Sequence, residues 1–344
     1  MRHRSLAVGV FSPSVLLRVA RAAGLFDQHG LTVTEVPVAS SPDQFRALLD
    51  GELDAAFTSP DNVLAYRFVP DNPLARTGDA RILAALDRGL GLGVYAAPGI
   101  TGADQLRGAA AGVDVPDSGF AFGLYAVLES LGLKWPGEPA GAARESGQAE
   151  ACGPAPAASG RAAPDPGAHG PAASGTAFGD YAIVSLGATP RRLTALLDGR
   201  CATTVLGAGS DLRAEAAGAA RLAGLTDVCG PYLGTALTAV GPRRSQAAHA
   251  LTSALAQTSR LIVSRVLDPL VLRETQDALG LPLDLATRFA ERLRDPADGL
   301  VPDGVADRAA LETVLGLRLR YRPGDDTLAT ALDPARGLLD PQAC

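Results

Sequence analysis

The chain of 344 residues contains a single lysine, Lys134, so nearly all of its positive charge comes from arginine. A phosphate-binding loop of the type GxxxxGK[ST] is therefore absent. Lys134 stands at the edge of a low-complexity segment, which argues against a Schiff-base mechanism. The net charge is −6 at pH 7, so we expect no nucleic-acid partner.

The sequence also lacks the common motifs of metal sites and hydrolases. It has no CxxC, HExxH or GxSxG motif, and we expect no metal, no cofactor and no assigned catalytic residue. The cysteines and histidines are scattered, as Cys152, Cys201, Cys229, Cys344, His3, His29, His169 and His249. Cys201 and Cys229 either pair or remain separate, semi-buried thiols.

No run of about 18 apolar residues occurs, so we expect no transmembrane helix. The first residues, MRHRSLAVGVF, contain a short apolar run that is typical of a first strand rather than of a secretory signal. We therefore expect a cytoplasmic location for the chain as written, and an extracytoplasmic one if the true start lies upstream.

The length of 344 residues fits two domains, each with its own core. Strand-like and helix-like segments alternate as far as residue 131, which is typical of an α/β fold. Residues 136–175 differ, because 31 of these 40 residues are Ala, Gly, Pro or Ser. We interpret them as a flexible insertion and not as a domain boundary. From residue 243 to residue 339 the apolar pattern is helical.

One segment of the chain occurs twice. Residues 40–62 read SSPDQFRALLDGELDAAFTSPDN, and residues 188–211 read ATPRRLTALLDGRCATTVLGAGSD. In both copies a proline opens a helix-like segment, ALLDG ends it, and an apolar strand leads into a small or polar turn. This repeat predicts two similar α/β lobes in one chain.

A set of short motifs accompanies the repeat: AAGLF at 22–26, GLTV at 30–33, LDGELDAA at 49–56, LRG at 106–108, GVDVP at 112–116 and SG at 118–119. Together they resemble the type II periplasmic-binding-protein superfamily, in particular its nitrate, sulfonate, taurine and thiamine-pyrimidine-precursor branch. The likeness covers nearly the whole chain except the insertion. It is specific for the fold and weak for the ligand, since the motifs are mostly turns, caps and packing positions.

The resemblance implies two lobes, each a mostly parallel sheet flanked by helices, with a ligand cleft between them. The first lobe would contain residues 1–90 and 230–344, and the second residues 91–229. The resemblance further implies that a small organic solute, expected to be an anion (a sulfonate, a carboxylate or a pyrimidine-like molecule), binds in the cleft by lobe closure. The protein would then be the substrate-binding component of an ABC importer, with the permease as its partner.

Two other functions fit the same scaffold. The first is that of a cytosolic enzyme, such as a lyase, a desulfinase or a pyrimidine-precursor synthase. Its acid–base pair would have to come from Asp61, Asp117 or Glu129. The second is that of a ligand-sensing module that signals to a partner protein.

In open α/β sheets, ligands bind beyond the carboxyl ends of the strands, where helix N-termini offer free N–H groups. The turns at these positions and the aromatic residues near them supply the candidate ligand-binding residues. They are Phe11, Ser12, Ser14, Ser40, Ser41, Thr58, Ser59, Asp61, Asn62, Asp117, Ser118, Gly119, Phe120, Ala188, Thr189, Gly207 and Tyr232.

Each candidate also has a purely structural interpretation. Ser12, Ser59, Ser118 and Thr189 would cap their own helices. The three aromatic residues Phe11, Phe120 and Tyr232 would pack in the core, and Asp61 and Asp117 would be acids of first helical turns instead of partners of an amine. Arg191 would pair with an acidic ligand or remain solvated. Because the first copy of the repeat ends in TSPDN and the second in GAGS, we expect the first lobe to supply most polar contacts.

Overall fold

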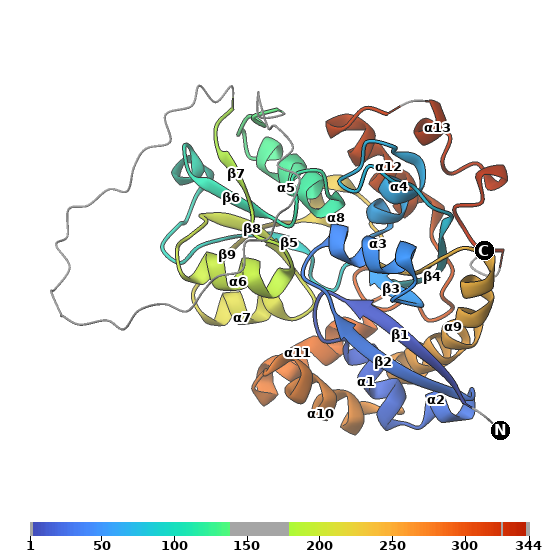
Figure 1. Cartoon of the computed structure of the whole chain (residues 1–344). Coiled ribbons are helices and arrows are strands. Elements are labelled where there is room, and N and C mark those ends of the chain that lie inside the picture. Colours follow the sequence, from blue (N-terminus) through green and yellow to red (C-terminus); the bar gives the residue numbers. More distant parts are fainter. Residues whose placement is uncertain (1–2, 138–178, 325, 342–344) are drawn as a thin grey trace, which may run out of the picture.

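The computed structural model describes residues 3–137, 179–324 and 326–341, and it contains two five-stranded sheets flanked by helices (Figure 1). Nearly all of the predicted insertion at 136–175, with Cys152 and His169, lies outside the described residues, as does Cys344. The two sheets with their helices confirm the two-lobed α/β architecture that the sequence predicts. Within the described part of the chain, no helix is long and apolar enough to cross a membrane.

The two sheets have the same strand arrangement. The first has the order β2-β1-β3-β10-β4, with β1 (Arg4–Val10), β2 (Leu31–Pro37), β3 (Ala55–Thr58), β4 (Ala80–Asp87) and β10 (Thr235–Val240). The second has the order β7-β6-β8-β5-β9, with β5 (Gly93–Ala96), β6 (Ala110–Val113), β7 (Ala182–Ser185), β8 (Thr203–Leu206) and β9 (Ala220–Gly224). The pairing directions leave one reversed strand in each sheet, β10 and β5, so both sheets are mostly parallel as predicted.

The sequence repeat occupies equivalent places in the two sheets. Its first copy forms α3 (Ser41–Asp50) and the central strand β3, and its second copy forms α6 (Thr189–Leu197) and the central strand β8. Gly51 and Gly199 have φ values of 86° and 69°, a left-handed conformation that favours glycine and ends each helix. The repeat therefore places two similar turns at the carboxyl ends of two central strands.

Helices cover both faces of the sheets. The first lobe has α1 (Val15–Ala22), α2 (Leu25–Gln28), α3, α4 (Pro60–Phe68), α9 (Pro242–Val263), α10 (Asp268–Leu279) and α11 (Leu283–Arg294). The second has a 3-10 helix (Ala103–Leu106), α5 (Gly119–Ser130), α6, α7 (Ser210–Ala216) and α8 (Leu225–Cys229). The chain ends with α12 (Arg308–Tyr321), α13 (Asp326–Ala329) and a 3-10 turn (Pro334–Arg336).

The chain passes between the lobes twice. Residues 88–92 lead from β4 into the reversed strand β5, and residues 230–234 lead from α8 into the reversed strand β10. The N–H group of Gly234 donates to the carbonyl oxygen of Asp87 at 3.0 Å, which joins the two crossing segments. Each reversed strand is thus the first strand after a crossing.

Helix α12 connects the lobes a third time, because it packs against both α4 and α5. Arg318 on α12 donates to both carboxylate oxygens of Asp61, at 2.6 and 2.7 Å, and to the carbonyl oxygen of Asp117 at 2.9 Å. Its guanidinium also lies 5.1 Å from the ring centroid of Phe122 on α5. Gly119 allows this close approach, since a Cβ atom there would collide with the Asp61 side chain.

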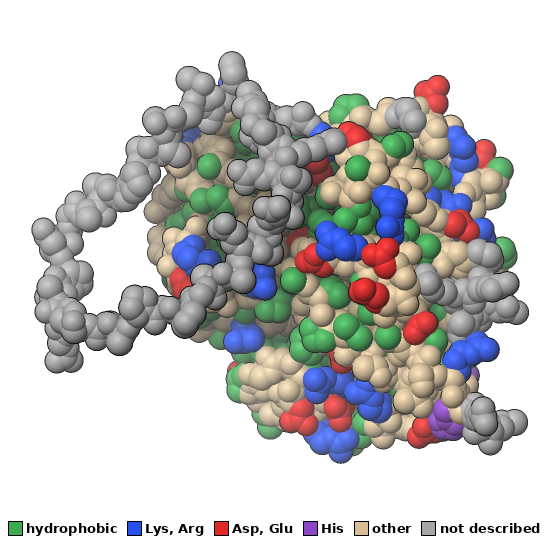
Figure 2. All heavy atoms as spheres, in the orientation of Figure 1, with side chains coloured by type: hydrophobic (Ala, Val, Ile, Leu, Met, Phe, Trp, Pro, Cys, Tyr) green, Lys and Arg blue, Asp and Glu red, His purple; other side chains and the backbone are tan. Residues whose placement is uncertain are grey.

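The two described cysteines do not pair with each other. Cys201 and Cys229 are separate thiols, the first buried and the second half-buried. On the face shown in Figure 2, arginine and carboxylate side chains are interspersed and do not gather into one basic surface.

Replacing Asp61 by Asn should leave the buried guanidinium of Arg318 without its counter-charge. We expect the free energy of unfolding, measured with urea, to fall by about 3–5 kcal/mol. The matched control is Glu312→Gln, which breaks an exposed pair with Arg308 on the same helix and should cost at most about 1 kcal/mol. Equal costs for the two variants would contradict a stabilising role for the Arg318–Asp61 pair.

Candidate functional site

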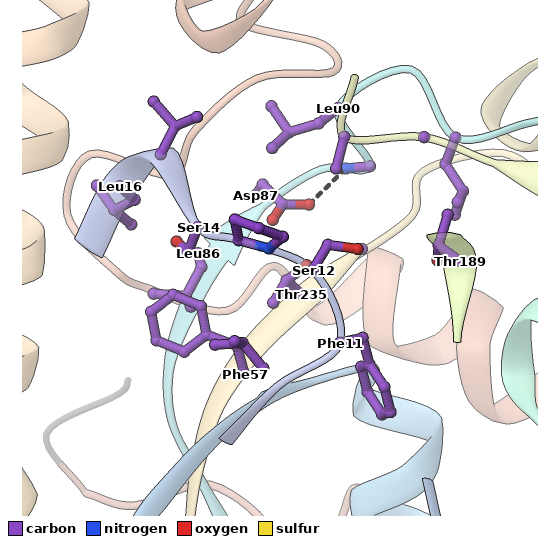
Figure 3. A pocket seen from close by; sticks show the side chains of 18 of the residues that line it. Phe11, Ser12, Ser14, Leu16, Phe57, Leu86, Asp87, Leu90, Thr189 and Thr235 are labelled. Carbon is purple, nitrogen blue, oxygen red and sulfur yellow. Dashed lines mark hydrogen bonds between the residues drawn. The ribbon is translucent and has the colours of Figure 1, made fainter. Parts of the chain in front are cut away.

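A cavity of about 150 Å³ lies between the lobes, and we call it the main cavity of the cleft (Figure 3). Its walls come from the turns after β1, β3 and β4, from the start of β10, and from α1, α10 and α11 of the first lobe. The second lobe contributes the starts of α5 and α6 and the turn after β8. This is the edge of the sheets at which α/β proteins bind ligands.

A second, smaller cavity of about 30 Å³ adjoins it, and we call it the side cavity. The two cavities share five of their lining residues and are therefore neighbouring parts of one cleft. The shared residues are Phe11, Ser59, Phe120, Thr189 and Arg192. The side cavity adds Asn62, Ser118, Gly119 and Ala188, together with Asp114 at the end of β6.

The predicted residues that reach the cleft come from both copies of the repeat. Those lining the main cavity are Phe11, Ser12, Ser14, Thr58, Ser59, Phe120, Thr189 and Gly207. Those found only in the side cavity are Asn62, Ser118, Gly119 and Ala188. Twelve of the seventeen candidates are thus brought together at one place, although a role in binding stays a prediction for each.

Five candidates lie elsewhere. Ser40 lines an outer groove on the surface, Ser41 is buried beneath it, and Asp61 is occupied by Arg318. Asp117 is partly exposed and lies 3.5 Å from Arg322, while Tyr232 is buried in the hydrophobic core. Glu129, the third candidate acid, accepts a hydrogen bond from Tyr321 and pairs with Arg320 at 2.8 Å.

The capping interpretation holds for some of the serines and not for others. Ser59 accepts from the N–H of Asp61 at 3.3 Å and Ser118 from that of Ala121 at 3.4 Å, so both are N-caps. Ser12 is not a cap, because α1 begins later and Ser14 caps it. Thr189 is the first residue of α6, whose N-cap is Ala188.

Part of the wall of the main cavity is apolar. It is bounded by side chains from α1, α10, α11 and two strands: Val15, Leu16, Phe57, Leu86, Leu279, Phe289 and Leu293. In Figure 3, Leu16 and Phe57 lie toward one side of the view and Thr189 toward the other. The cavity thus offers an apolar wall opposite a polar one.

Arg192 is the main charged group of the polar wall. Its side chain is buried on α6 and donates to the carbonyl oxygens of Gly187 at 2.8 Å and Val205 at 3.3 Å, and to the hydroxyl of Thr189 at 3.0 Å. The acceptors that the described residues offer to the guanidinium in these hydrogen bonds are all uncharged. Burial lowers the pKa of Arg192, but arginine remains protonated in proteins. The direct hydrogen-bond partners of this buried positive charge are therefore neutral, and the carboxylate of Asp114 acts on it only from a distance.

Two carboxyl groups also line the cleft. Asp87, at the end of β4, accepts from the N–H of Gly89 at 2.9 Å and is hydrogen-bonded to Thr235 as well. Burial raises the pKa of Asp87 from its ordinary value of 3.8 to about 7. Asp114 lines the side cavity, as does Arg192, whose charge has the opposite sign.

The lobes also meet outside the cavities. The N–H of Ala188 donates to the carbonyl oxygen of Ala39 at 3.1 Å across the mouth of the cleft. Two arginines of α11 pair with acids of α7. Arg288 pairs with Glu215 at 3.0 Å, and Arg292 pairs with Asp211. The cleft is therefore bordered by contacts between the lobes.

Arg192, Asp87 and Asp114 were not among the residues predicted from sequence. Arg192 falls on the buried face of α6 with Leu193, Ala195 and Leu196, so the helical period of this segment identifies it as inward-facing, unlike its exposed neighbour Arg191. Asp87 and Asp114 each stand at the carboxyl end of a strand. The other candidates were predicted from this same position, where α/β sheets bind ligands.

No protein-family model matches the chain, and no curated protein matches it by sequence. Among solved structures, a protein from Bordetella bronchiseptica RB50 is similar with a TM-score of 0.67 and 19% identity over 98% of this chain and 95% of that chain. The periplasmic aliphatic sulphonate binding protein SsuA from Escherichia coli has a TM-score of 0.59 and 12% identity over 92% and 86%.

The periplasmic nitrate-binding protein NrtA from Synechocystis PCC 6803 is similar with a TM-score of 0.59 and 11% identity, over 82% of this chain and 69% of that chain. At these identities the similarity shows the fold. It confirms the two-lobed α/β fold that the sequence predicts, which the sulphonate-binding and nitrate-binding proteins share.

The raised pKa of Asp87 predicts a pH-dependent stability. Between about pH 4 and about pH 7 the folded state binds more protons at this group than the unfolded state, so the free energy of unfolding falls as pH rises through that range. Asp87→Asn removes this titration. We expect the variant to be more stable than the wild type above pH 7, by at most about 4 kcal/mol, and to gain little at pH 4.

Thermal melts of both proteins between pH 4 and pH 8 measure this difference. Asp277→Asn, on an exposed position of α10, is the control, and its melting temperatures should follow those of the wild type. If Asp87→Asn also runs parallel to the wild type at every pH, the carboxyl group of Asp87 titrates normally.

Proposed function

We propose that the protein binds a small organic anion in the cleft between its lobes, as the substrate-binding component of an ABC importer. The observation that carries this proposal is Arg192. Its guanidinium is buried, lines both cavities and has no carboxylate within hydrogen-bonding distance in the described part of the chain. An acidic group of the ligand supplies the missing negative charge.

The surroundings of Arg192 support an anion rather than a neutral ligand. A buried charge is unfavourable unless it is paired, and neutral carbonyl and hydroxyl partners offset only part of that cost. An arginine also binds carboxylate, sulfonate and phosphonate oxygens through two parallel N–H groups. The hydroxyl of Thr189, which accepts a hydrogen bond from Arg192, can donate its own proton to the same anion.

The remaining walls define the rest of the ligand. Phe57, Leu16 and Phe289 form part of an apolar surface that suits an alkyl or aromatic body. The cavity volume of about 150 Å³ limits the ligand to a small molecule. We therefore propose a compact organic acid with an acidic head at Arg192 and an apolar body toward α1 and α11.

The similar structures lend further support. Two of them are named for the binding of anions, an aliphatic sulphonate and nitrate. One is described as the ligand binding component of an ABC-type import system and another as an ABC transporter. The permease of an importer is accordingly the proposed partner.

The composition of the cleft favours binding over catalysis. The described residues that line the two cavities include no His, Cys or Lys, and Asp87, Asp114 and Arg192 are their ionisable groups. Asp61, Asp117 and Glu129, the three acids that the sequence offered for acid–base catalysis, lie outside both cavities.

The test is a thermal-shift and titration screen of the full chain against small sulfonates, phosphonates and carboxylates. Anions that fit should raise the melting temperature of the wild type, and Arg192→Gln should weaken their affinity at least about 100-fold, since it removes a buried charge–charge hydrogen bond. Arg191→Gln is the control, because Arg191 is the exposed neighbour on the same helix, and it should change the affinity less than about threefold.

The variant Arg192→Lys tests the contribution of the positive charge separately from that of the forked hydrogen bonds. Lysine retains the positive charge but loses the forked hydrogen bonds to two carbonyl groups, so some anion binding should remain. Affinity that survives Arg192→Gln unchanged, in a protein that is still folded by circular dichroism, would sink the proposal.

A further inference from the structure

Asp87 is an acid in the wall of the main cavity, and Arg192 is the other ionisable group among the described residues that line it. Asp87 ends β4, where the chain first crosses between the lobes, and its exposed fraction is 6%. In Figure 3 it lies among the other labelled residues of the cavity, and the dashed line marks its hydrogen bond with Gly89. Anion binding by Arg192 alone gives this acid no role.

The direct partners of Asp87 are neutral. Its Oδ1 atom accepts from the N–H of Gly89 at 2.9 Å, and Thr235 is hydrogen-bonded to it as well. A Cβ atom on Gly234 would lie 2.4 Å from Oδ1, so the second crossing segment packs closely against the carboxyl group. A buried carboxylate without a positively charged partner is unfavourable, and taking up a proton relieves that cost. The surroundings of Asp87 therefore favour its neutral form.

The charged groups of the surrounding elements do not supply a positive partner. Asp298, in the loop after α11, is the charge that acts most strongly on Asp87, and it has the same sign, as has Asp114 in the side cavity. Burial, and to a smaller degree Asp298, raises the pKa of Asp87 to about 7. The nearby arginines have acceptors elsewhere. They are Arg88, which donates to the carbonyl oxygen of Leu300 at 2.7 Å, Arg292, which pairs with Asp211 of α7, and Arg192 with its neutral acceptors.

An anion in the cavity strengthens the preference of Asp87 for a proton. The body of the ligand displaces water from the cavity, and a carboxylate that loses its water is less stable than a hydrated one. The acidic head of the ligand adds a second negative charge to the same cleft. A neutral carboxyl group avoids both costs and can donate a hydrogen bond to the ligand. Anion binding and protonation therefore favour each other, because such a coupling is reciprocal.

We propose that Asp87 makes anion binding proton-linked, so that the cleft takes up its organic anion together with one proton. This inference rests on the proposed binding of an anion by Arg192. The two groups then have separate roles, since Arg192 attracts the acidic head and Asp87 sets the pH range in which the closed cleft holds the ligand. Affinity is highest where Asp87 is already protonated in the free protein and falls as pH rises beyond that range.

A structural alternative is that Asp87 only fastens the first crossing segment through the N–H of Gly89. In that case the stability of the fold still depends on pH, but the affinity for an anion does not. The pH profile of the affinity therefore distinguishes a positioning role in the crossing from a role in binding.

The experiment is an isothermal titration of the full chain with ethanesulfonate, benzenesulfonate and iodide. These anions do not titrate between pH 6 and pH 8, so any pH dependence belongs to the protein. If only the protonated form of Asp87 binds, the affinity should fall about tenfold from pH 6 to pH 8. At pH 7.5, heats measured in bis-tris and in Tris, two buffers without an acidic group, should show the uptake of more than about half a proton per bound anion.

The variant Asp87→Asn has a neutral side chain at every pH. It should bind these anions with an affinity that changes less than about twofold between pH 6 and pH 8, and without proton uptake. Asp277→Asn, at an exposed position of α10, is the control and should keep the tenfold change of the wild type.

The outcomes separate this inference from the proposed function. If the wild type binds equally well at pH 6 and pH 8, and a folded Arg192→Gln variant no longer binds, the role of Asp87 is overturned and anion binding stands. A tenfold change that persists in Asp87→Asn overturns it as well. If no probe binds at either pH, or if binding persists in Arg192→Gln, both are overturned. Because the pH profile is measured first in the wild type, the inference can be rejected even if Asp87→Asn does not fold.

Discussion

The proposed function of this cleft depends on how the fold holds the guanidinium of Arg192. Helix α6 carries the side chain inward, and the carbonyl oxygens of Gly187 and Val205 fix its orientation at 2.8 and 3.3 Å. These neutral acceptors hold the group without cancelling its charge. The polar surroundings of Ser59, Thr189 and the first turns of α4 and α5 add to the attraction for an anion. In the proposed function, an acidic ligand completes the pairing of this charge from outside the chain.

The two sheets place this charge opposite an apolar wall because they share one arrangement. The repeated helix–strand unit supplies the central strands β3 and β8, and the turns that follow them both reach the main cavity, through Thr58 and Gly207. The crossing segments at 88–92 and 230–234 meet at Asp87, beside the cavity. Contacts of α12, of α11 and of Ala39 then bring the lobes together around it.

Local patterns sufficed to predict the lobes, the central strands and the turns that line the cleft, because the repeat and the strand ends are local features. They did not place Asp61, since its partner Arg318 is 257 residues away and its pairing depends on tertiary packing. Nor did they place Tyr232, whose ring packs in the hydrophobic core. The helical period of α6 identifies Arg192 as inward-facing. The residue that the sequence suggested as a partner of an acidic ligand was its exposed neighbour Arg191. The neutral hydrogen-bond partners of Asp87 could be recognised only from the packed structure.

The most direct measurement is a crystal structure of the protein grown with sodium iodide, in which anomalous scattering locates the bound anions. If Arg192 presents an unpaired charge to the cleft, an iodide peak should lie within hydrogen-bonding distance of its guanidinium, inside the cavities and next to Thr189. Iodide bound only at exposed arginines such as Arg191, with none beside Arg192, would contradict an anion site between the lobes.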